Sequence, residues 1–404
     1  MPASLPLLPT PQRDASAAIS ADGPQPLRKR KAAGPSGSAS DAAPMGELPS
    51  LDDRVLAELA PLVAKLADSG AEPRALLQAL TKLRQAFATQ IDPPIQELIA
   101  VGGLPPLASR LSSPETSPVS RLECAWVLTN AASGTSEQTA ALVEAGVPGA
   151  AIAALASPQI AERHELCDQL LWVLGNIAGD GDSRLRDHLL FDGIFSALQV
   201  LFEQMPSFNW HLQGRAQVLR TMTWLMSSLC RGEPAPALEA VDCCFDYFVQ
   251  AVAGSEDEKL LYEALWGICY LLEGATSTAD SSLRSARLLA AAGEAPPSRA
   301  HPLIQRTVLL ARRTVTDPNF PLPVPALRLL GLFVSTSAPE VVDAALASGL
   351  VGTFRSILTD SKAPEEARRD AAWALSNAAA GTPAQAKAVV AEPKAFEALC
   401  EMAE

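Results

Sequence analysis

The pattern of apolar residues separates an N-terminal stretch from the rest of the chain. Residues 1–50 are rich in Pro, Ala, Ser and Gly and show no apolar period. A segment of this kind cannot bury enough surface to offset the entropy lost on ordering, so we predict a disordered tail. From Leu51 to Glu404, apolar residues recur three and four positions apart, which predicts amphipathic helices.

The predicted helices follow a repeating order. After a first pair, Leu51–Leu66 and Glu72–Thr89, the sequence Pro93-Pro94 breaks the chain. Each following unit has a short helix, a glycine, a middle helix and a long third helix. The first two units are Ile95–Val101, Leu104–Leu111 and Ser120–Ala132, then Ser136–Glu144, Gly149–Leu155 and Arg163–Ala178. The later third helices are Gln217–Cys230, Lys259–Leu272, Val324–Val334 and Ala367–Ala380.

Three helices per unit are typical of the armadillo repeat, whereas HEAT-type repeats have two. The reference positions of successive third helices are 46, 52, 42, 62 and 45 residues apart; they are Trp126, Trp172, Trp224, Trp266, Arg328 and Trp373. We therefore predict an all-α protein, a right-handed α-solenoid of about seven armadillo repeats over residues 51–404. The two long intervals predict loop insertions at Met205–Gln213 and Thr276–Arg299. The chain stops one or two helices into a further unit, so we expect either a short array or an incomplete sequence.

One short motif recurs within the third helices. A Trp is followed four residues later by an Asn, and then by a Gly that ends the helix. The copies are Trp126/Asn130/Gly134, Trp172/Asn176/Gly179 and Trp373/Asn377/Gly381. Positions i and i+4 lie on one face of a helix, so each copy presents an indole beside a carboxamide. Stacked repeats align such faces into a ladder of similar subsites, which suits an extended ligand.

Charge and hydropathy narrow the class of protein. The formal net charge of −13 argues against a nucleic-acid binder, whose phosphate contacts require clustered Lys and Arg. It suits a basic partner, because a negative groove raises the capture rate of positive ligands. The N-terminus lacks a signal pattern, and no uncharged apolar run approaches the ~18–20 residues of a membrane span, so we predict no membrane association.

The residue types that usually carry chemistry are scattered. The seven Cys form no C-x-x-C pair and the four His stand at no ligand spacing, so we predict no metal, no cofactor and no disulfide framework. Buried free thiols indicate a reducing compartment, the cytoplasm or the nucleus. No Ser or Cys nucleophile sits in a recognisable turn, and no glycine-rich phosphate loop follows a strand. We therefore predict a protein that is not an enzyme.

Longer motifs point to one family. They are W-x-L-T-N-x-A-S-G-T-S-E-Q-T at Trp126–Thr139, W-x-L-G-N-I-A-G-D at Trp172–Asp180, C-R-G-x-P at Cys230–Pro234 and the segment Ile91–Glu97. We call the Trp and Asn positions of one third helix a row. The fourth row, Trp266/Tyr270, has Tyr in place of Asn, and the next row has Arg328 in place of Trp. This ordered set resembles the importin-α family of armadillo adaptors, which recognise nuclear localisation signals. The resemblance extends from Leu48 to the C-terminus.

The resemblance implies a nuclear import adaptor of the cytoplasm and nucleus that binds Lys/Arg-rich signals of cargo proteins. Its major groove would consist of Trp126, Asn130, Gly134, Thr139, Trp172, Asn176, Asp180, Trp224, Ser228, Trp266 and Tyr270. Asp180 would take the deepest lysine of the signal, with the Gly134 carbonyl and Thr139 in the same pocket. A second, minor groove would use Arg328, Asp370, Trp373 and Asn377.

These residue types suit a basic peptide. Parallel indoles hold the aliphatic stem of Lys or Arg, and the cation gains ~0.5–2 kcal/mol from the ring. A carboxamide can bond the N–H and the C=O of one peptide residue. Acids one turn before the reference positions would make the rim negative; they are Glu123, Asp168, Glu263 and Asp370. The hypothesis expects both Asn carboxamides to be exposed in one continuous groove lined by Trp126, Asn130, Trp172, Asn176 and Asp180. If these side chains are buried or point to different faces, the receptor hypothesis fails.

The chain departs from the family pattern at several positions. Ser228 stands where the third row has Asn, which shortens one backbone clamp, and Leu332 replaces Asn in the Arg328 row. Only Trp373/Asn377 represents the later rows, so binding of two-part signals is in doubt. The basic cluster of the tail, Arg28, Lys29, Arg30 and Lys31, is shorter than the segment with which the family binds importin-β, leaving importin-β as a candidate partner. The cluster could equally be a localisation signal of the chain itself, an autoinhibitory mimic of cargo, or chance.

Ordinary structural roles remain alternatives. A Trp at helical spacing is usually a core residue, Asp180 could cap the turn after its helix, and Glu123 and its equivalents could be solvated charges. The alternative function is an armadillo scaffold that has lost nuclear transport and binds another extended partner. A purely structural array is a third interpretation.

Overall fold

The computed structural model describes residues 53–89, 93–293, 301–336, 338–360, 363, 365–392 and 397. The tail with Arg28–Lys31, and Ile91 and Asp92 of the family motif, lie outside the described residues. Within the described ranges the structure is helical and contains no strand, as predicted. Contacts divide the chain into two compact units, whose described parts are residues 53–225 and 226–397. We call these the N-terminal and the C-terminal unit; a single domain over residues 51–404 stays a prediction.

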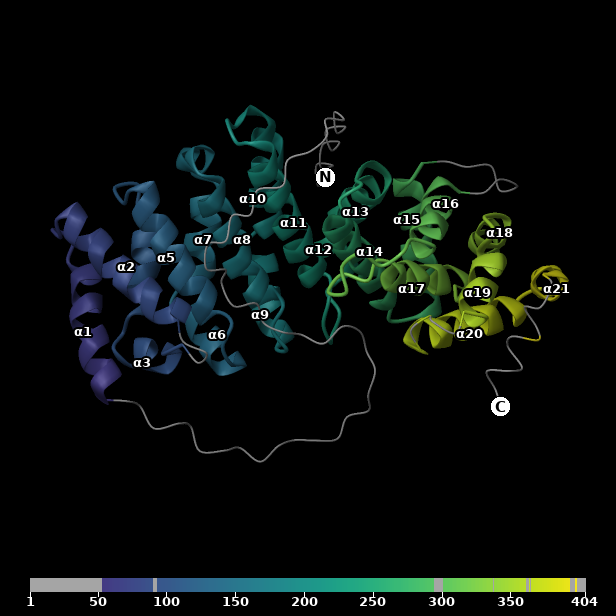
Figure 1. The fold of residues 1–404 in the computed structure, drawn as a ribbon, viewed down its shortest axis with the longest axis horizontal. Coiled ribbons are helices and arrows are strands. Elements are labelled where there is room, and N and C mark those ends of the chain that lie inside the picture. Colours follow the sequence, from purple (N-terminus) through teal and green to yellow (C-terminus); the bar gives the residue numbers. More distant parts are fainter. Residues whose placement is uncertain are drawn as a thin grey trace. The chain divides into compact units, whose positions relative to one another are not determined.

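The N-terminal unit repeats three helices in a fixed order (Figure 1). Its helices are α1 (Asp53–Ala67), α2 (Pro73–Thr89), α3 (Ile95–Ala100), α4 (Leu104–Ser112), α5 (Pro118–Ala131), α6 (Ser136–Glu144), α7 (Val147–Leu155), α8 (His164–Ala178), α9 (Ser183–Phe191), α10 (Ile194–Gln204) and most of α11 (Leu212–Leu229). The third helices α2, α5 and α8 contact one another in sequence, as do the short helices α3, α6 and α9 and the middle helices α4, α7 and α10. Each repeat therefore packs on its neighbours, as in a solenoid.

A glycine with positive φ makes the turn between the short and the middle helix. Gly146 (φ 76°) directly precedes α7, and Gly193 (φ 79°) directly precedes α10. Glycine adopts this left-handed region without the steric penalty that a Cβ imposes. The turn lets both helices bury leucines in one core, such as Leu142 on α6 and Leu155 on α7. The recurring glycine of the sequence pattern thus reflects backbone geometry.

A second glycine, at the end of the third helix, leaves room for a capping box. The Thr135 hydroxyl accepts from the Gln138 backbone N–H (3.3 Å), and the Gln138 Oε1 accepts from the Thr135 N–H (2.9 Å). A Cβ on Gly134 would lie 2.1 Å from that Oε1. Gly381 is in the same position before the Thr382/Gln385 box, where the distance is 2.2 Å. Helix α6 therefore starts in a fixed place relative to α5.

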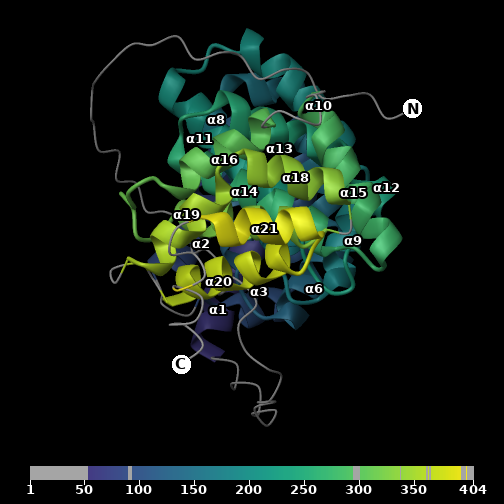
Figure 2. The ribbon, with the colours of Figure 1, turned by 90° about the vertical axis from the view of Figure 1, so that its right-hand side faces the viewer.

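The C-terminal unit continues the three-helix order. Its helices are α12 (Leu238–Val241), α13 (Cys243–Gly254), α14 (Glu258–Glu273), α15 (Thr278–Ala291), α16 (Pro302–Ala311), α17 (Pro323–Val334), α18 (Pro339–Ala347), α19 (Leu350–Leu358), α20 (Glu365–Ala379) and α21 (Pro383–Ala391). The third helices α14, α17 and α20 pack in sequence, as do the middle helices α13, α16 and α19. Figure 2, which looks onto the C-terminal helices, shows α20 and α21 side by side, in agreement with their packing.

The predicted loop insertion at Thr276–Arg299 is wrong for its first part, which forms helix α15. Arg284 on this helix is 3% exposed, and its guanidinium donates to the Leu271 carbonyl oxygen (2.8 Å) and to Asp280 (3.0 Å). Arg287 reaches the carboxylates of Asp242, just before α13, and of Asp246 on α13. The Ala- and Ser-rich composition suggested a loop, but the buried Arg284 and the half-buried Arg287 dock the segment as a helix. Residues 294–300 lie outside the described part.

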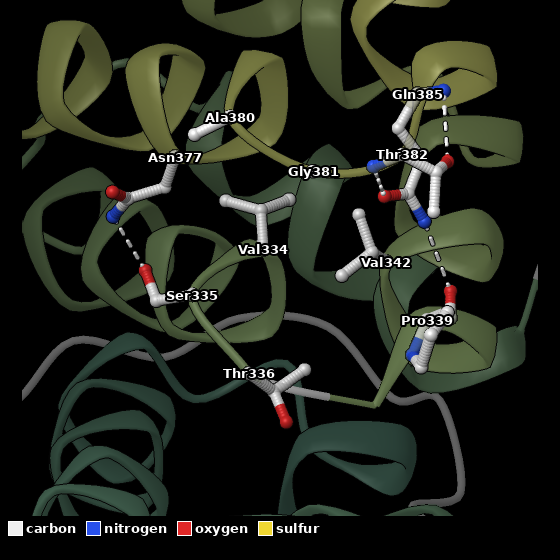
Figure 3. Close-up of a pocket in the computed structure, with 10 residues that line it drawn as sticks. All are labelled: Val334, Ser335, Thr336, Pro339, Val342, Asn377, Ala380, Gly381, Thr382 and Gln385. Atoms are coloured by element: carbon white, nitrogen blue, oxygen red, sulfur yellow. Dashed lines mark hydrogen bonds between the residues drawn. The ribbon is translucent and has the colours of Figure 1, made fainter.

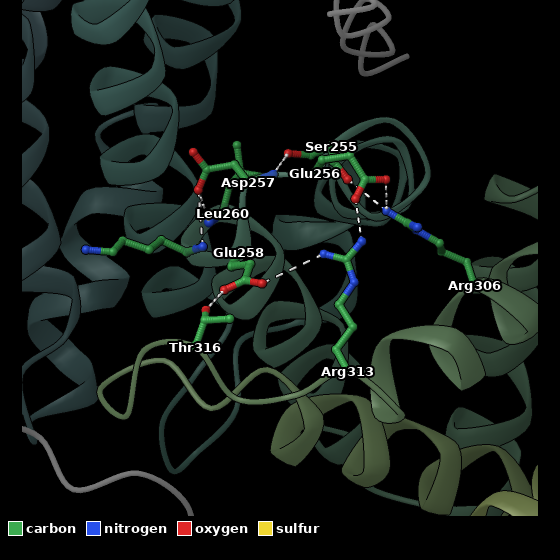
Figure 4. A network of polar contacts seen from close by, with 9 residues as sticks. Ser255, Glu256, Asp257, Glu258, Leu260, Arg306, Arg313 and Thr316 are labelled. Carbon is green, nitrogen blue, oxygen red and sulfur yellow. Dashed lines mark hydrogen bonds and ion pairs between the residues drawn. The ribbon is translucent and has the colours of Figure 1, made fainter. Parts of the chain in front are cut away.

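The long connector between α16 and α17 is held by charges on the α13–α14 loop (Figure 4). Arg306 donates to the Glu256 carboxylate (2.7 Å) and to the Ser255 carbonyl oxygen (2.9 Å), and Arg313 also pairs with Glu256. These arginines, Arg313 foremost, lower the pKa of Glu256. Thr316 donates to Glu258 at the start of α14. The connector is thereby fixed to the preceding repeat.

Candidate functional site

The first two Trp/Asn rows lie on third helices that pack against each other. Helix α5 carries Trp126 and Asn130, and α8 carries Trp172 and Asn176. The Asn176 side-chain Nδ2 donates a 3.0 Å hydrogen bond to the Thr129 carbonyl oxygen of α5. The second row is therefore fixed directly to the helix that carries the first.

Both carboxamides are buried, so the expectation that they are exposed is wrong, and this outcome counts against the receptor hypothesis. Asn130 is 1% exposed and Asn176 0%, while Trp172 is 4% exposed and Trp126 is half-buried. The sequence shows which face a residue shares, but not how closely the next repeat covers that face. The hydrogen bond to Thr129 draws the Asn176 amide into the contact between α5 and α8.

Asn176 nevertheless keeps an unmet hydrogen-bonding capacity. Among the described residues no donor reaches its buried Oδ1, and no acceptor reaches the buried Trp126 Nε1. A buried polar atom without a partner costs about 1–3 kcal/mol, and amides of a protein core are normally paired. Both atoms are enclosed by the protein, so a ligand N–H or carbonyl could bond them only if the packing over them opened.

The acid predicted for the deepest lysine lies in the turn after α8. Asp180 is 9% exposed, and its Oδ1 accepts from the Ser136 hydroxyl (2.5 Å) and from the Asp182 backbone N–H (3.0 Å). The second bond is the turn-capping role that the sequence left open, while the first ties the carboxylate to the start of α6. Thr139, fully buried on α6, donates to the Thr135 carbonyl oxygen (3.0 Å). The structure thus joins Asp180 to the helix that carries Thr139.

Two residues at this corner, Ser136 and Glu137, were not predicted as site residues. Ser136 holds Asp180, and Glu137 adds a carboxylate to the first turn of α6. Hydrogen bonds from its own backbone N–H and from Thr135 lower the pKa of Glu137, against desolvation and repulsion by Asp180. Glu137 is exposed and stays ionised at neutral pH. The capping pattern Thr135–Gln138 is the signal in the sequence that could have identified both.

The four acids one turn before the reference positions join neighbouring third helices. Their contacts are Glu123–Arg84 (2.6 Å), Asp168–Thr221 (2.5 Å), Glu263–Ser227 (3.2 Å) and Asp370–Arg328 (3.8 Å). None of the four is an exposed side chain, so the interpretation as ordinary solvated charges is wrong. Arginines compensate the charges of Glu123 and Asp370, whereas Thr221 and Ser227 are neutral partners of Asp168 and Glu263.

Trp224 on α11 packs against a glycine of the preceding third helix. A Cβ on Gly175 would lie 2.1 Å from the indole Cζ3 of Trp224. The same relation holds inside the C-terminal unit, where a Cβ on Gly331 would lie 2.7 Å from Cζ3 of Trp373. The glycine in W-x-L-G-N is therefore needed by the Trp of the next row. The sequence contained this signal, but only the packing gives it a meaning.

The fourth row belongs to the C-terminal unit. The Trp266 and Tyr270 rings on α14 are stacked, with centroids 5.7 Å apart and an interplanar angle of 19°. Burial raises the pKa of Tyr270 to about 12, despite the nearby Arg231, so the phenol stays protonated and able to donate. Ser228, the predicted substitute for an Asn, is 7% exposed near the end of α11.

A pocket of about 430 Å³ lies between the turns after α17 and α20 (Figure 3). It is lined by Val334, Ser335, Thr336, Pro339, Val342, Asn377, Ala380, Gly381, Thr382 and Gln385. Asn377, predicted for the minor groove, donates from Nδ2 to the Ser335 hydroxyl (2.8 Å). The lining is uncharged: Gly381 stands eight residues after Trp373, as Asp180 stands eight after Trp172. Ser335, Thr336 and Gln385 were not predicted.

The other residues predicted for the minor groove meet around one arginine. The Arg328 guanidinium carbon lies 5.1 Å from the centre of the Trp373 ring. Its Nε bonds Glu273 (2.6 Å), and its Nη1 lies 3.8 Å from Asp370. The structure therefore brings Arg328, Asp370 and Trp373 together. Arg328 itself occupies the ring and the acid that were predicted for a ligand cation.

The described residues show little that would support catalysis. No group of three or more His, Cys, Asp or Glu in this part of the chain could hold a metal ion. The rings of His164 and His211 lie 4.5 Å apart, which the sequence did not suggest, and burial lowers the pKa of His164. Along the described residues no single helix is long and apolar enough to cross a membrane, although two bent helix pairs, α6 with α7 and α18 with α19, reach that length and composition.

Two importin subunits and one engineered protein are similar to this chain. Importin subunit alpha-1b from Oryza sativa subsp. japonica is 34% identical over 209 residues, which is 52% of this chain and 36% of the relative. Importin subunit alpha-1a from the same organism is 30% identical over 314 residues, 78% of this chain and 53% of the relative. The chain thus spans about a third to a half of these relatives. The crystal structure of an engineered protein matches with a TM-score of 0.68 at 22% identity, covering 86% of this chain and 74% of the other. No protein-family model matches.

The repeated order of short, middle and third helices, together with the structural match, defines the class of protein as an armadillo-repeat solenoid. Its Trp/Asn rows on α5 and α8 and its sequence relatives narrow this class. The chain is a divergent importin-α-like armadillo-repeat protein.

Proposed function

We propose that this chain is a nuclear import adaptor that binds Lys/Arg-rich nuclear localisation signals along the rows on α5 and α8. The buried Asn176 Oδ1, which no described donor reaches, is the observation that carries the proposal. Its Nδ2 is already used by Thr129, so the amide is half satisfied. An Asn that served only the core would be expected to have both ends paired. A peptide N–H could complete it only after the side chains that enclose the amide, which is 0% exposed, have moved aside.

The surrounding groups favour a basic ligand. An extended peptide advances ~3.3 Å per residue with alternating side chains, so its backbone can reach Asn176 while side chains point to either side. The half-buried Trp126 indole would offer a face for the stem and charge of Lys or Arg, and the Trp172 indole, only 4% exposed, would line the same slot. The corner of Asp180 and Glu137 supplies negative charge for an ammonium group. The net charge of −13 would speed the capture of such a peptide.

The remaining predictions are part of the same proposal. By analogy with the importin subunits it resembles, the protein would work in the cytoplasm and nucleus, with importin-β as a second partner. Trp224 would extend the major groove within the N-terminal unit, Ser228, Trp266 and Tyr270 would be subsites of the C-terminal unit, and the pocket beside Asn377 would be part of a minor groove there.

A titration of a fluorescent basic peptide against the full chain tests the site. Asp180→Lys and the double change Trp172→Ala/Asn176→Ala should each weaken binding at least about tenfold, the loss expected from one or two charged or buried hydrogen bonds. Asp192→Lys reverses an exposed charge at the end of α9 and is the matched control, for which affinity should stay within about twofold. Unchanged affinity in both site variants would overturn the assignment.

The alternative is an armadillo scaffold for a partner that is not basic. The uncharged pocket at Gly381 favours it for the C-terminal unit, because a lysine there would meet no carboxylate among the lining residues. The two functions separate in the same titration: the scaffold would bind a neutral analogue, with Gln in place of every Lys and Arg, as tightly as the basic peptide.

A further inference from the structure

An arginine of the chain already occupies one face of the first tryptophan. The guanidinium carbon of Arg84, on α2, lies 5.3 Å from the centre of the Trp126 ring on α5. Its Nε bonds the Glu123 carboxylate at 2.6 Å. The Arg84 and Glu123 side chains are 19% and 15% exposed, so solvent screens this pair less than a surface pair. A cation over the ring and an acid beside it are the two elements of a subsite for Lys or Arg.

The C-terminal unit repeats this arrangement independently. Arg328 lies 5.1 Å from the Trp373 ring centre, and Asp370 is three residues before that Trp, as Glu123 is three residues before Trp126. In both units the arginine comes from the third helix that precedes the Trp in the packing order. The same internal contact at two positions argues against an accident of one side chain.

We infer that Arg84 is a specificity-determining residue that ends the row of cation subsites at Trp126. It fills the ring face that α5 turns toward α2 and neutralises Glu123, so a basic side chain of a ligand finds neither group there. On its other side α5 packs on α8, which carries the next Trp/Asn row. The inference rests on the proposed function and deepens it, because Arg84 would limit the number of basic peptide residues that bind at the α2 end of the groove.

Removal of Arg84 should therefore create a subsite. In Arg84→Ala the Trp126 face and the Glu123 carboxylate both become available to a cation. A peptide with one additional Lys at the terminus that reaches α2 should then bind about five- to tenfold more tightly than the core peptide. An extended chain reaches α2 with one end only, so the gain should appear for an added lysine at one terminus and not at the other.

The experiment measures the ratio of affinities for extended and core peptides in full-length variants. The ratio should be near one in the wild type, rise in Arg84→Ala, and fall part of the way back in Arg84→Ala/Glu123→Ala, where only the Trp126 face remains for the added lysine. Arg184→Ala removes the same charge from an exposed position on α9 and should behave as the wild type. Arg84→Gln carries the same expectation as Arg84→Ala and serves if the alanine variant does not fold, which circular dichroism shows.

The outcomes distinguish failure of the role of Arg84 from failure of the proposed function. A ratio in Arg84→Ala and Arg84→Gln equal to that of the wild type, with tight binding of the core peptide, overturns the role of Arg84 and leaves the proposed function intact. Failure of the wild type to bind the core peptide overturns the proposed function and the inference with it. A rise that persists undiminished after the loss of Glu123 also overturns the inference, because the gain would then come from charge elsewhere.

Discussion

Gly175 on α8 lies directly against the Trp224 indole of α11, and a Cβ at this glycine would be only 2.1 Å from Cζ3. The ring can approach the helix backbone because the glycine has no side chain. Row spacing in the N-terminal unit thus depends on a residue that is not itself a predicted ligand contact. Such a relation is invisible until two helices are placed side by side.

Gly175→Val should displace Trp224 and destabilise the protein. Overpacking of this kind costs about 1–3 kcal/mol, which would lower the midpoint of urea denaturation and shift Trp emission. Gly149→Ala is the control: this helical glycine on α7 has open space around it, so the change should leave stability equal or raise it by up to about 1 kcal/mol. Equal stability of the valine variant and the wild type would contradict the contact.

Ser136→Ala should weaken binding of a Lys-rich peptide without removing the acid. The variant loses the 2.5 Å hydrogen bond that holds Asp180 against α6. One such bond is worth about 0.5–1.5 kcal/mol, so affinity should fall about two- to tenfold in a peptide titration. Ser109→Ala, at an exposed position on α4, is the control. If Asp180→Asn weakens binding and Ser136→Ala does not, Ser136 has no positioning role.

His301 should make stability depend on pH. It is 4% exposed, and burial lowers its pKa below 6.5, against hydrogen bonds to the Gly293 and Leu289 carbonyl oxygens. The folded state favours the neutral ring, so the unfolded state binds more protons as the pH falls below 6.5. The contribution of His301 is therefore complete above about pH 6.5 and is lost as the pH falls toward the folded pKa.

Urea denaturation at pH 7.5 and pH 5.5 measures this dependence. His301→Gln should reduce the difference in unfolding free energy between the two pH values. His188→Gln, on the exposed side of α9, should leave the difference as in the wild type. An unchanged difference in the His301 variant would show that the ring is not held neutral.

The described cysteines should differ strongly in reactivity. Burial raises the pKa of Cys124 to about 12, and it also raises those of Cys167 and Cys269. Cys243 is half-buried at the start of α13, and a hydrogen bond with Cys244 lowers its pKa. Because the thiolate is the nucleophile, iodoacetamide at pH 7.5 should alkylate Cys243 at least about tenfold faster than Cys124.

Peptide mass mapping after short exposure reads the order of alkylation. Cys243→Ser should remove the fast site and leave the slow rate of Cys124 unchanged. Equal rates at Cys124 and Cys243 in the native protein would contradict the burial described for α5.

The helices of the repeats could be predicted closely because their signals are local. Apolar spacing, the Gly between the short and the middle helix, and the capping pattern at Thr135 act within a few residues. Helix α15 was missed because composition outweighed periodicity in that stretch, and the buried Arg284 that docks it looks like any surface arginine in the sequence. Its partner, the Leu271 carbonyl, is a backbone group that no sequence pattern reveals.

By itself the sequence determined the repeat, its period, and which indole and carboxamide share a helix face, since positions i and i+4 meet through helix geometry alone. The tertiary structure decided that Asn130 and Asn176 are buried, that Arg84 takes Glu123 and a face of Trp126, and that Ser136 holds Asp180. These contacts join residues of successive repeats, 39 apart for Arg84 and Glu123 and 44 apart for Ser136 and Asp180. Their geometry follows from how closely one helix packs on the next, which no local pattern contains.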